Sequence, residues 1–87
     1  MPTAIVVYRK PGCALCDEVD DRLDDLLRGV PEVTVTHVNV LSDTVLFERY
    51  RYRVPVIEIG GIERLSLRFD DRELRAALAE AGCVTRE

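Results

Sequence analysis

The stretch TAIVVYRKPGCALC, residues 3–16, decides the fold of this chain. Residues 3–8 form a continuous, β-branched apolar run, which is typical of a strand covered on both faces. Pro11 and Gly12 end that run, and Cys13 and Cys16 follow where a helical pattern begins. Residues three positions apart are neighbours on a helix, so the two sulfurs lie close together. The stretch therefore predicts a strand, a loop and a helix that opens with a cysteine pair.

The position of Cys13 at the first turn of the predicted helix indicates thiol chemistry. Unpaired backbone N–H groups and the positive end of the helix dipole stabilise the thiolate, which is the reactive form. Lys10, three residues earlier, adds a positive charge that favours the same form. Cys16 lies one turn further in, where partial burial keeps it a thiol until it attacks a mixed disulfide on Cys13. We therefore expect Cys13 to be the nucleophile and Cys16 the resolving residue.

Apolar periodicity predicts the elements that follow the cysteines. From Leu15 to Gly29 the apolar residues recur at helical spacing, and the acidic residues between them form a face that we interpret as solvated rather than as a cation site. Valines over residues 33–40 predict a second strand. Ser and Asp at 42–43 are good caps for a short helix through Tyr50.

The last third of the chain predicts a hairpin and a helix. Residues 54–59 and 62–67 are strand-like runs joined by a two-glycine turn. Asp70, with Glu73 three residues later, resembles a capping box for a helix that Gly82 ends. The predicted order is β-α-β-α-β-β-α, an α/β fold with a four-stranded mixed sheet flanked by helices, in a single domain over residues 1–87.

This order, with Cys-x-x-Cys opening the first helix and Val-Pro opening the third strand, resembles the thioredoxin-like fold in its short form, the glutaredoxins. The residues that carry the resemblance are Tyr8, Lys10, Cys13, Cys16, Val54 and Pro55. The chain is most similar to the bacterial glutaredoxin-like proteins, which share a Cys-x-Leu-Cys-Asp start. The resemblance implies a thiol-disulfide oxidoreductase or electron carrier. Its substrate would be a disulfide-bearing protein or a low-molecular-weight thiol, and its electron donor a reductase or glutathione.

The resemblance also implies a docking groove beside the cysteines. It implies a cis peptide bond between Val54 and Pro55, which leaves the backbone of Val54 free to pair with an extended thiol substrate. The alternative is an ordinary trans proline that ends the preceding loop. Replacement of Pro55 by alanine is expected to impair substrate exchange and folding only if the bond is cis.

Basic residues on either side of the cysteine loop suggest a substrate with carboxylates. Lys10, Arg9 and the stretch Arg49–Arg53 would together present positive charge suited to glutathione or to an acidic protein partner. Alternatively, Tyr50 belongs to the core and the arginines pair with surface carboxylates.

Two departures from the pattern of glutathione-binding glutaredoxins predict that glutathione is at best a poor ligand. Arg53 stands where those proteins have threonine, and Arg68 and Phe69 stand where they have two glycines. Asp70 and Asp71 follow, and they either meet a ligand ammonium group or cap the last helix.

Composition excludes other classes of protein. At 87 residues, with 47% hydrophobic and 32% charged, the chain has the proportions of a folded soluble domain. It has no apolar run of membrane length, and a net charge of -4 argues against general nucleic-acid binding. No secretory-signal pattern follows Met1, so we expect a cytoplasmic protein, and a monomer.

Three alternatives to dithiol catalysis remain. The fold is also compatible with a redox-inert binding or redox-sensing module that keeps only the groove. A zinc site would need Cys13, Cys16, Cys83 and His37 together, and an iron–sulfur cluster would be shared between two chains. We expect His37 to be a polar surface residue or a satisfied one rather than a ligand, and Cys83 to be a spare thiol or the source of a mixed or intermolecular disulfide.

Overall fold

The computed structural model describes residues 2–83. The elements in chain order are β1 (Thr3–Arg9), α1 (Ala14–Leu27), β2 (Val33–Asn39), the 3-10 helix η1 (Val40–Ser42), α2 (Thr44–Tyr50), β3 (Val56–Ile59), β4 (Ile62–Ser66) and α3 (Asp71–Glu80). The strands form one sheet in the order β2-β1-β3-β4. β1 is parallel to β2, and β3 is antiparallel to β1 and β4. The predicted fold class and element order are confirmed.

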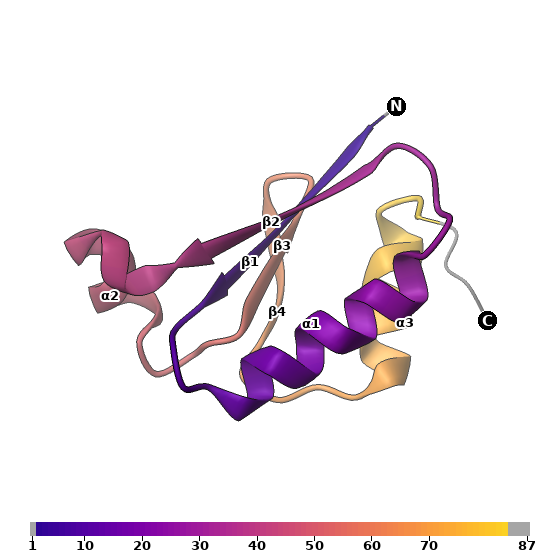
Figure 1. The fold of residues 1–87 in the computed structure, drawn as a ribbon. Coiled ribbons are helices and arrows are strands. Elements are labelled where there is room, and N and C mark those ends of the chain that lie inside the picture. Colours follow the sequence, from indigo (N-terminus) through magenta and orange to yellow (C-terminus); the bar gives the residue numbers. More distant parts are fainter. Residues whose placement is uncertain (1, 84–87) are drawn as a thin grey trace.

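The main core lies between the sheet and two of the helices. α1 and α3 lie on the same side of the sheet (Figure 1). Ile5 and Val7 alternate along β1 toward this side, and Leu23 of α1 with Leu74 and Leu78 of α3 pack against them. This packing sets the direction of α1. It therefore also sets where Cys13, just before the first residue of α1, lies relative to the end of β1.

A second, smaller cluster lies at the cysteine end of the sheet. Its buried members are Cys16, Val40, Tyr50, Val54 and Val56. These residues come from α1, η1, α2 and the start of β3, so the cluster joins the cysteine helix to the segment that contains Pro55. The helix α2, which supplies Tyr50, lies beyond the carboxyl end of β2 (Figure 1).

Element boundaries differ from the predicted ones at the edges of this second cluster. The third strand begins at Val56 rather than at residue 54, and the Val54–Pro55 peptide bond just before it is cis. The fourth strand ends at Ser66 because Leu67 has a φ of 65°, which is incompatible with an extended strand. Of the helices in residues 2–83, none combines the length and apolarity needed to cross a membrane.

Candidate functional site

Cys13 and Cys16 form a disulfide at the start of α1. Cys13 is the N-cap residue, with extended backbone angles, and its Sγ accepts a hydrogen bond from the Cys16 N–H at 3.1 Å. The two Cα atoms are 5.2 Å apart. Cys13 is half-buried, whereas Cys16 is 0% exposed. An incoming sulfur can therefore reach Cys13, whereas the surrounding protein covers Cys16.

The segment around Pro55 packs against this pair. The Val54–Pro55 bond is cis, as the resemblance implied, and Val54 is buried in the same cluster as Cys16. The Leu67 N–H donates to the carbonyl oxygens of Arg53 at 3.0 Å and Pro55 at 2.9 Å. Within residues 2–83, no backbone hydrogen bond of this loop involves Val54. Its N–H and C=O are thus the unpaired groups expected of a site that binds an extended chain.

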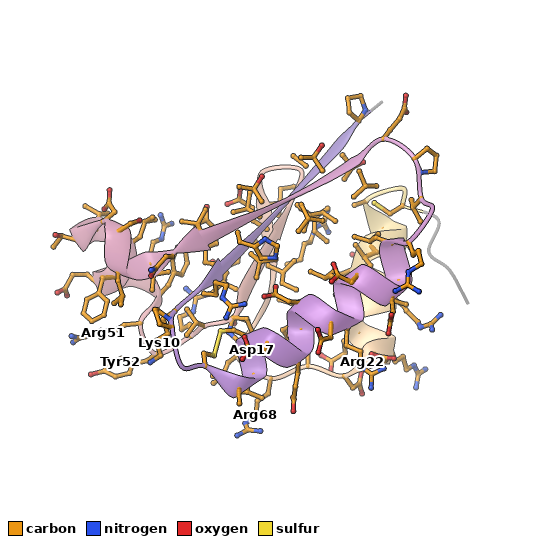
Figure 2. All side chains as sticks on the ribbon, viewed as in Figure 1. Lys10, Asp17, Arg22, Arg51, Tyr52 and Arg68 are labelled. Atoms are coloured by element: carbon orange, nitrogen blue, oxygen red, sulfur yellow. A yellow bond between two sulfur atoms is a disulfide. The ribbon has the colours of Figure 1, made fainter. Side chains whose placement is uncertain are left out.

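Lys10 joins the end of β1 to the loop that precedes Val54. Its Nζ donates to the carbonyl oxygen of Arg51 at 3.4 Å. The Arg51 guanidinium lies over two aromatic rings, 5.5 Å from the centre of Phe47 and 4.7 Å from that of Tyr52. In Figure 2 Lys10, Arg51 and Tyr52 gather on one side of the disulfide, and Asp17 lies on the other side. Lys10 therefore belongs to the site, although its direct contact is with a carbonyl group and not with a sulfur.

Arg9 does not join the other basic residues that the sequence suggested around the cysteine loop. Its guanidinium donates to Asp17 at 2.7 Å and to Asp20, both in α1. The hydrogen bond that Arg9 donates to Asp17 and the nearby carboxylate charges raise the pKa of Arg9. Asp20 also faces His37, with Oδ1 and Nε2 3.0 Å apart. The acidic face of α1 is therefore solvated, as expected, apart from Asp20, which is partly buried and lies against Arg9 and His37.

Arg53 is also committed within the protein. It makes an ion pair with Glu63 of β4, and its guanidinium lies 5.6 Å from the centre of the Tyr50 ring. Tyr50 is a core residue that stacks on Tyr8, with 4.7 Å between the ring centres. These contacts agree with the alternative expectation for Arg53 and Tyr50, in which the tyrosine is core and the arginine pairs with a carboxylate.

Tyr8 has a polar contact that the sequence did not suggest. Its hydroxyl donates to Glu58 at 3.2 Å. Burial, reinforced by the charge and the hydrogen bond of Glu58, raises the pKa of Tyr8. The tyrosine thus holds a protonated hydroxyl beside the cluster that contains Cys13 and Cys16.

The two aspartates before the last helix are occupied by local contacts. Asp70 is the N-cap of α3: its carboxylate accepts from the Glu73 N–H, and the Glu73 side chain accepts from the Asp70 N–H. Asp71 lies 3.4 Å from Nε of Arg22 in α1. Of the two predicted roles for Asp70, the structure therefore shows the cap.

A groove of about 440 Å³ lies between α1 and the connection from β4 to α3. It is lined by Leu15, Glu18, Val19, Arg22, Leu67, Arg68, Phe69, Asp70, Asp71 and Leu74. Leu15 lies between the two cysteines in the chain, so the groove adjoins the disulfide. The sequence did not suggest it, because its two walls are about 50 residues apart and meet only in the fold.

The residues considered for a metal do not come together. Cys83 is a free thiol buried in the main core with Leu78 and Leu74, whereas Cys13 and Cys16 belong to the second cluster. Within residues 2–83, no three histidine, cysteine or carboxylate side chains are grouped so that they could hold a metal ion. Because Cys83 is buried, an intermolecular disulfide through it would require the end of α3 to open.

The arrangement of a sheet, an N-terminal cysteine pair and a facing cis-proline matches a known family. The family model described as glutaredoxin-like domain (DUF836) matches residues 4–79. The chain belongs to this glutaredoxin-like family. A comparison with curated proteins finds no match.

Solved structures agree with this glutaredoxin-like assignment. The structural genomics target protein XcR50 from X. campestris is 30% identical, with a TM-score of 0.72 over 87% of this chain and 96% of that one. Protein Ne2328 from Nitrosomonas europaea is 26% identical, with a TM-score of 0.72 over 88% and 92%. Thioredoxin O2 from Arabidopsis thaliana, in its oxidized state, is 17% identical with a TM-score of 0.67 over 91% and 74%, which shows a shared fold. The glutaredoxin-like domain thus combines a thioredoxin-like fold with a cysteine pair at disulfide distance.

Proposed function

We propose that this glutaredoxin-like domain is a thiol-disulfide oxidoreductase that reduces disulfides through Cys13 and Cys16. The observation that carries the proposal is the difference in access between the two sulfurs: Cys13 is half-buried at the helix N-cap, and Cys16 is fully buried one turn further in. The hydrogen bond that the Cys13 sulfur accepts from the Cys16 N–H is one that would stabilise a thiolate there.

The proposed reaction has two exchange steps. In the first, the Cys13 thiolate attacks one sulfur of a substrate disulfide, so that a mixed disulfide forms and the other substrate sulfur leaves as a thiolate. In the second, Cys16 loses its proton to solvent or to that thiolate and attacks Cys13. The Cys13–Cys16 disulfide forms, and the second substrate sulfur leaves. Two electrons pass from the protein to the substrate, and an external thiol donor returns them.

The loop before β3 would hold the substrate during these steps. The unpaired N–H and C=O of Val54 can accept an extended chain as a short added strand, with Pro55 fixing the direction of that backbone. The substrate would be a disulfide-bearing protein or a small thiol, and the donor a reductase or glutathione. Glutathione is expected to bind weakly, because Arg53 is paired with Glu63 and Asp70 caps α3.

The test separates the roles of the two cysteines. Cys13→Ser should abolish reduction of a disulfide substrate, whereas Cys16→Ser should accumulate a mixed disulfide on Cys13 that mass spectrometry detects. Cys83→Ser is the matched control, because it removes a buried thiol outside the site and should leave both steps intact. Alkylation of the reduced protein at pH 6 that labels Cys16 before Cys13 would contradict the assignment. If the wild-type protein reduces no disulfide and Cys16→Ser traps no mixed disulfide, the result would instead favour a redox-inert binding module.

A further inference from the structure

Several cations and exposed apolar side chains gather at the cysteine end of the molecule, and we call this set the basic rim. The basic rim consists of Lys10, Arg51, Tyr52, Leu67 and Arg68. Lys10 follows β1, Arg51 and Tyr52 follow α2, and Leu67 and Arg68 follow β4, so three separate connections converge on the cysteine end of the molecule. Figure 2 shows Arg51 and Tyr52 beside Lys10, and Arg68 at the start of α1.

The cations of the basic rim lack a carboxylate partner, as do Arg49 of α2 and Arg72 of α3 among the described residues. Five arginines have a carboxylate partner: Arg9, Arg22, Arg28, Arg53 and Arg64. By contrast, Lys10, Arg51 and Arg68 make no ion pair with a carboxylate in the described part of the chain. The chain has a net charge of -4, yet these three cations without a carboxylate partner lie at the cysteine end of the molecule (Figure 2).

Arg51 is held in a form suited to bind a carboxylate. Its guanidinium lies over the rings of Phe47 and Tyr52, and its own backbone carbonyl accepts from Lys10. Stacking occupies the faces of a guanidinium and leaves its N–H edge available for a two-pronged bond to a carboxylate. A cation fixed before binding loses less conformational entropy than a free side chain when it binds.

The apolar members of the basic rim indicate a macromolecular partner. Tyr52 is 75% exposed and Leu67 is 44% exposed. Leu67 has a φ of 65°, a backbone conformation unfavourable for leucine, and its N–H is bonded to both Arg53 and Pro55. These hydrogen bonds hold Leu67 beside the loop that carries Val54, with its side chain partly exposed. Tyrosine and arginine presented together are the residues that dominate binding energy in protein interfaces.

We propose that the basic rim is a docking surface for an acidic segment of a disulfide-bearing protein substrate. The proposal rests on the proposed oxidoreductase function and names its substrate class. Carboxylates that flank the substrate cysteine would meet Arg51 on one side of the disulfide and Arg68 on the other. The substrate backbone would pair with Val54, and Tyr52 and Leu67 would cover its apolar side chains. Asp17, in the first turn of α1, is ion-paired with Arg9, which reduces its repulsion of an acidic segment.

The test compares three disulfide-bearing peptides that differ only in the residues flanking the cysteines: glutamate, glutamine or lysine. The protein is reduced beforehand, and the rate constant of a single turnover is measured. The glutamate peptide should react about 3- to 10-fold faster than the glutamine peptide at low salt, and the lysine peptide more slowly than both. Because the cations are partly exposed, this preference should shrink as salt rises.

Matched variants locate the preference on the basic rim. Arg51→Gln and Arg68→Gln should each lower the ratio of glutamate-peptide to glutamine-peptide rates by about 2- to 5-fold. Arg68 is exposed and makes no ion pair with the described residues, so its replacement tests the surface even if loss of Arg51 loosens the aromatic stack. Arg28→Gln is the control: it changes the net charge equally, about 20 Å away at the other end of α1, and should leave the ratio unchanged.

Each remaining outcome overturns a specific part of the reasoning. Equal rates for the three peptides would refute the docking surface while the oxidoreductase function stands. If Arg51→Gln and Arg68→Gln slow the reduction of oxidised glutathione as much as that of the glutamate peptide, the occupant is a small thiol, and the protein partner is refuted. If reduced protein transfers electrons to no disulfide, the proposed function fails and the docking surface fails with it.

Discussion

Asp70 offers a measurement that decides between helix capping and ligand binding. Its Oδ1 accepts from the Glu73 N–H at 2.8 Å, and the return bond from the Asp70 N–H to Glu73 is 3.4 Å long. Removing an N-cap oxygen typically costs about 1 kcal/mol, and the exposed return bond adds little. The cost is felt by the whole fold because Leu74, one turn later, is buried in the main core. We therefore expect Asp70→Ala to lower the free energy of unfolding by about 1–1.5 kcal/mol.

The assay is urea unfolding of the oxidised protein, followed by circular dichroism. With a slope of about 1 kcal/mol per molar urea, Asp70→Ala should lower the midpoint by about 1 M. Asp70→Asn keeps an acceptor oxygen and loses only the charge, so it should cost about 0.3–0.5 kcal/mol. Asp71→Ala, the neighbouring control, breaks an exposed ion pair with Arg22 and should cost about 0.5 kcal/mol or less. If Asp70→Asn destabilises as much as Asp70→Ala, the cap is not the role of this carboxylate.

Two further predictions concern the core and the tyrosine beside the cysteines. Leu78→Ala, at a side chain that is 0% exposed in the main core, should cost about 3–5 kcal/mol, whereas Leu41→Ala, at one that is 55% exposed, should change the unfolding free energy by less than about 0.5 kcal/mol. Burial and Glu58 raise the pKa of Tyr8 in the folded state. The contribution of the protonated hydroxyl to the free energy of unfolding is therefore complete below about pH 10, the pKa of tyrosine in the unfolded chain, and is lost as pH rises through the pKa in the folded state. An absorbance titration of Tyr8→Phe should lack a step that wild-type protein shows above that range; an unchanged titration would contradict the shift.

Much of the fold follows from local pattern, because the signals in this chain agree with one another. The β-branched run over residues 3–8 became β1, and helical spacing after Cys13 became α1. The capping box at Asp70 starts α3 where it was predicted to start. Each of these signals lies within a single element, and each depends on hydrogen bonds or side-chain periodicity within that element. The cis bond before Pro55 was expected from the family resemblance, since Val-Pro alone is usually trans.

Leu67 shows where local pattern fails. It continues the alternation of the fourth strand in the sequence, and a leucine carries no signal for a left-handed backbone. The conformation is imposed from a distance, because the carbonyl groups of Arg53 and Pro55 both accept from its N–H. The strand therefore ends one residue early, and the chain turns into the wall of the groove beside Leu15. No pattern in residues 62–69 predicts that turn.

The second property that the sequence alone could not assign is which basic side chains remain without a carboxylate partner. Arg9 and Lys10 are adjacent, yet Arg9 shares the face of β1 with Ile5 and Val7 and so meets the carboxylates of α1. Lys10 is the first residue beyond the strand, and it turns to the carbonyl of Arg51 instead. The positive charge available to a partner is what remains after such pairing. Because the pairs join residues from different elements, the number of basic residues near a cysteine overestimates the charge that a substrate meets, and the fold decides which cations face it.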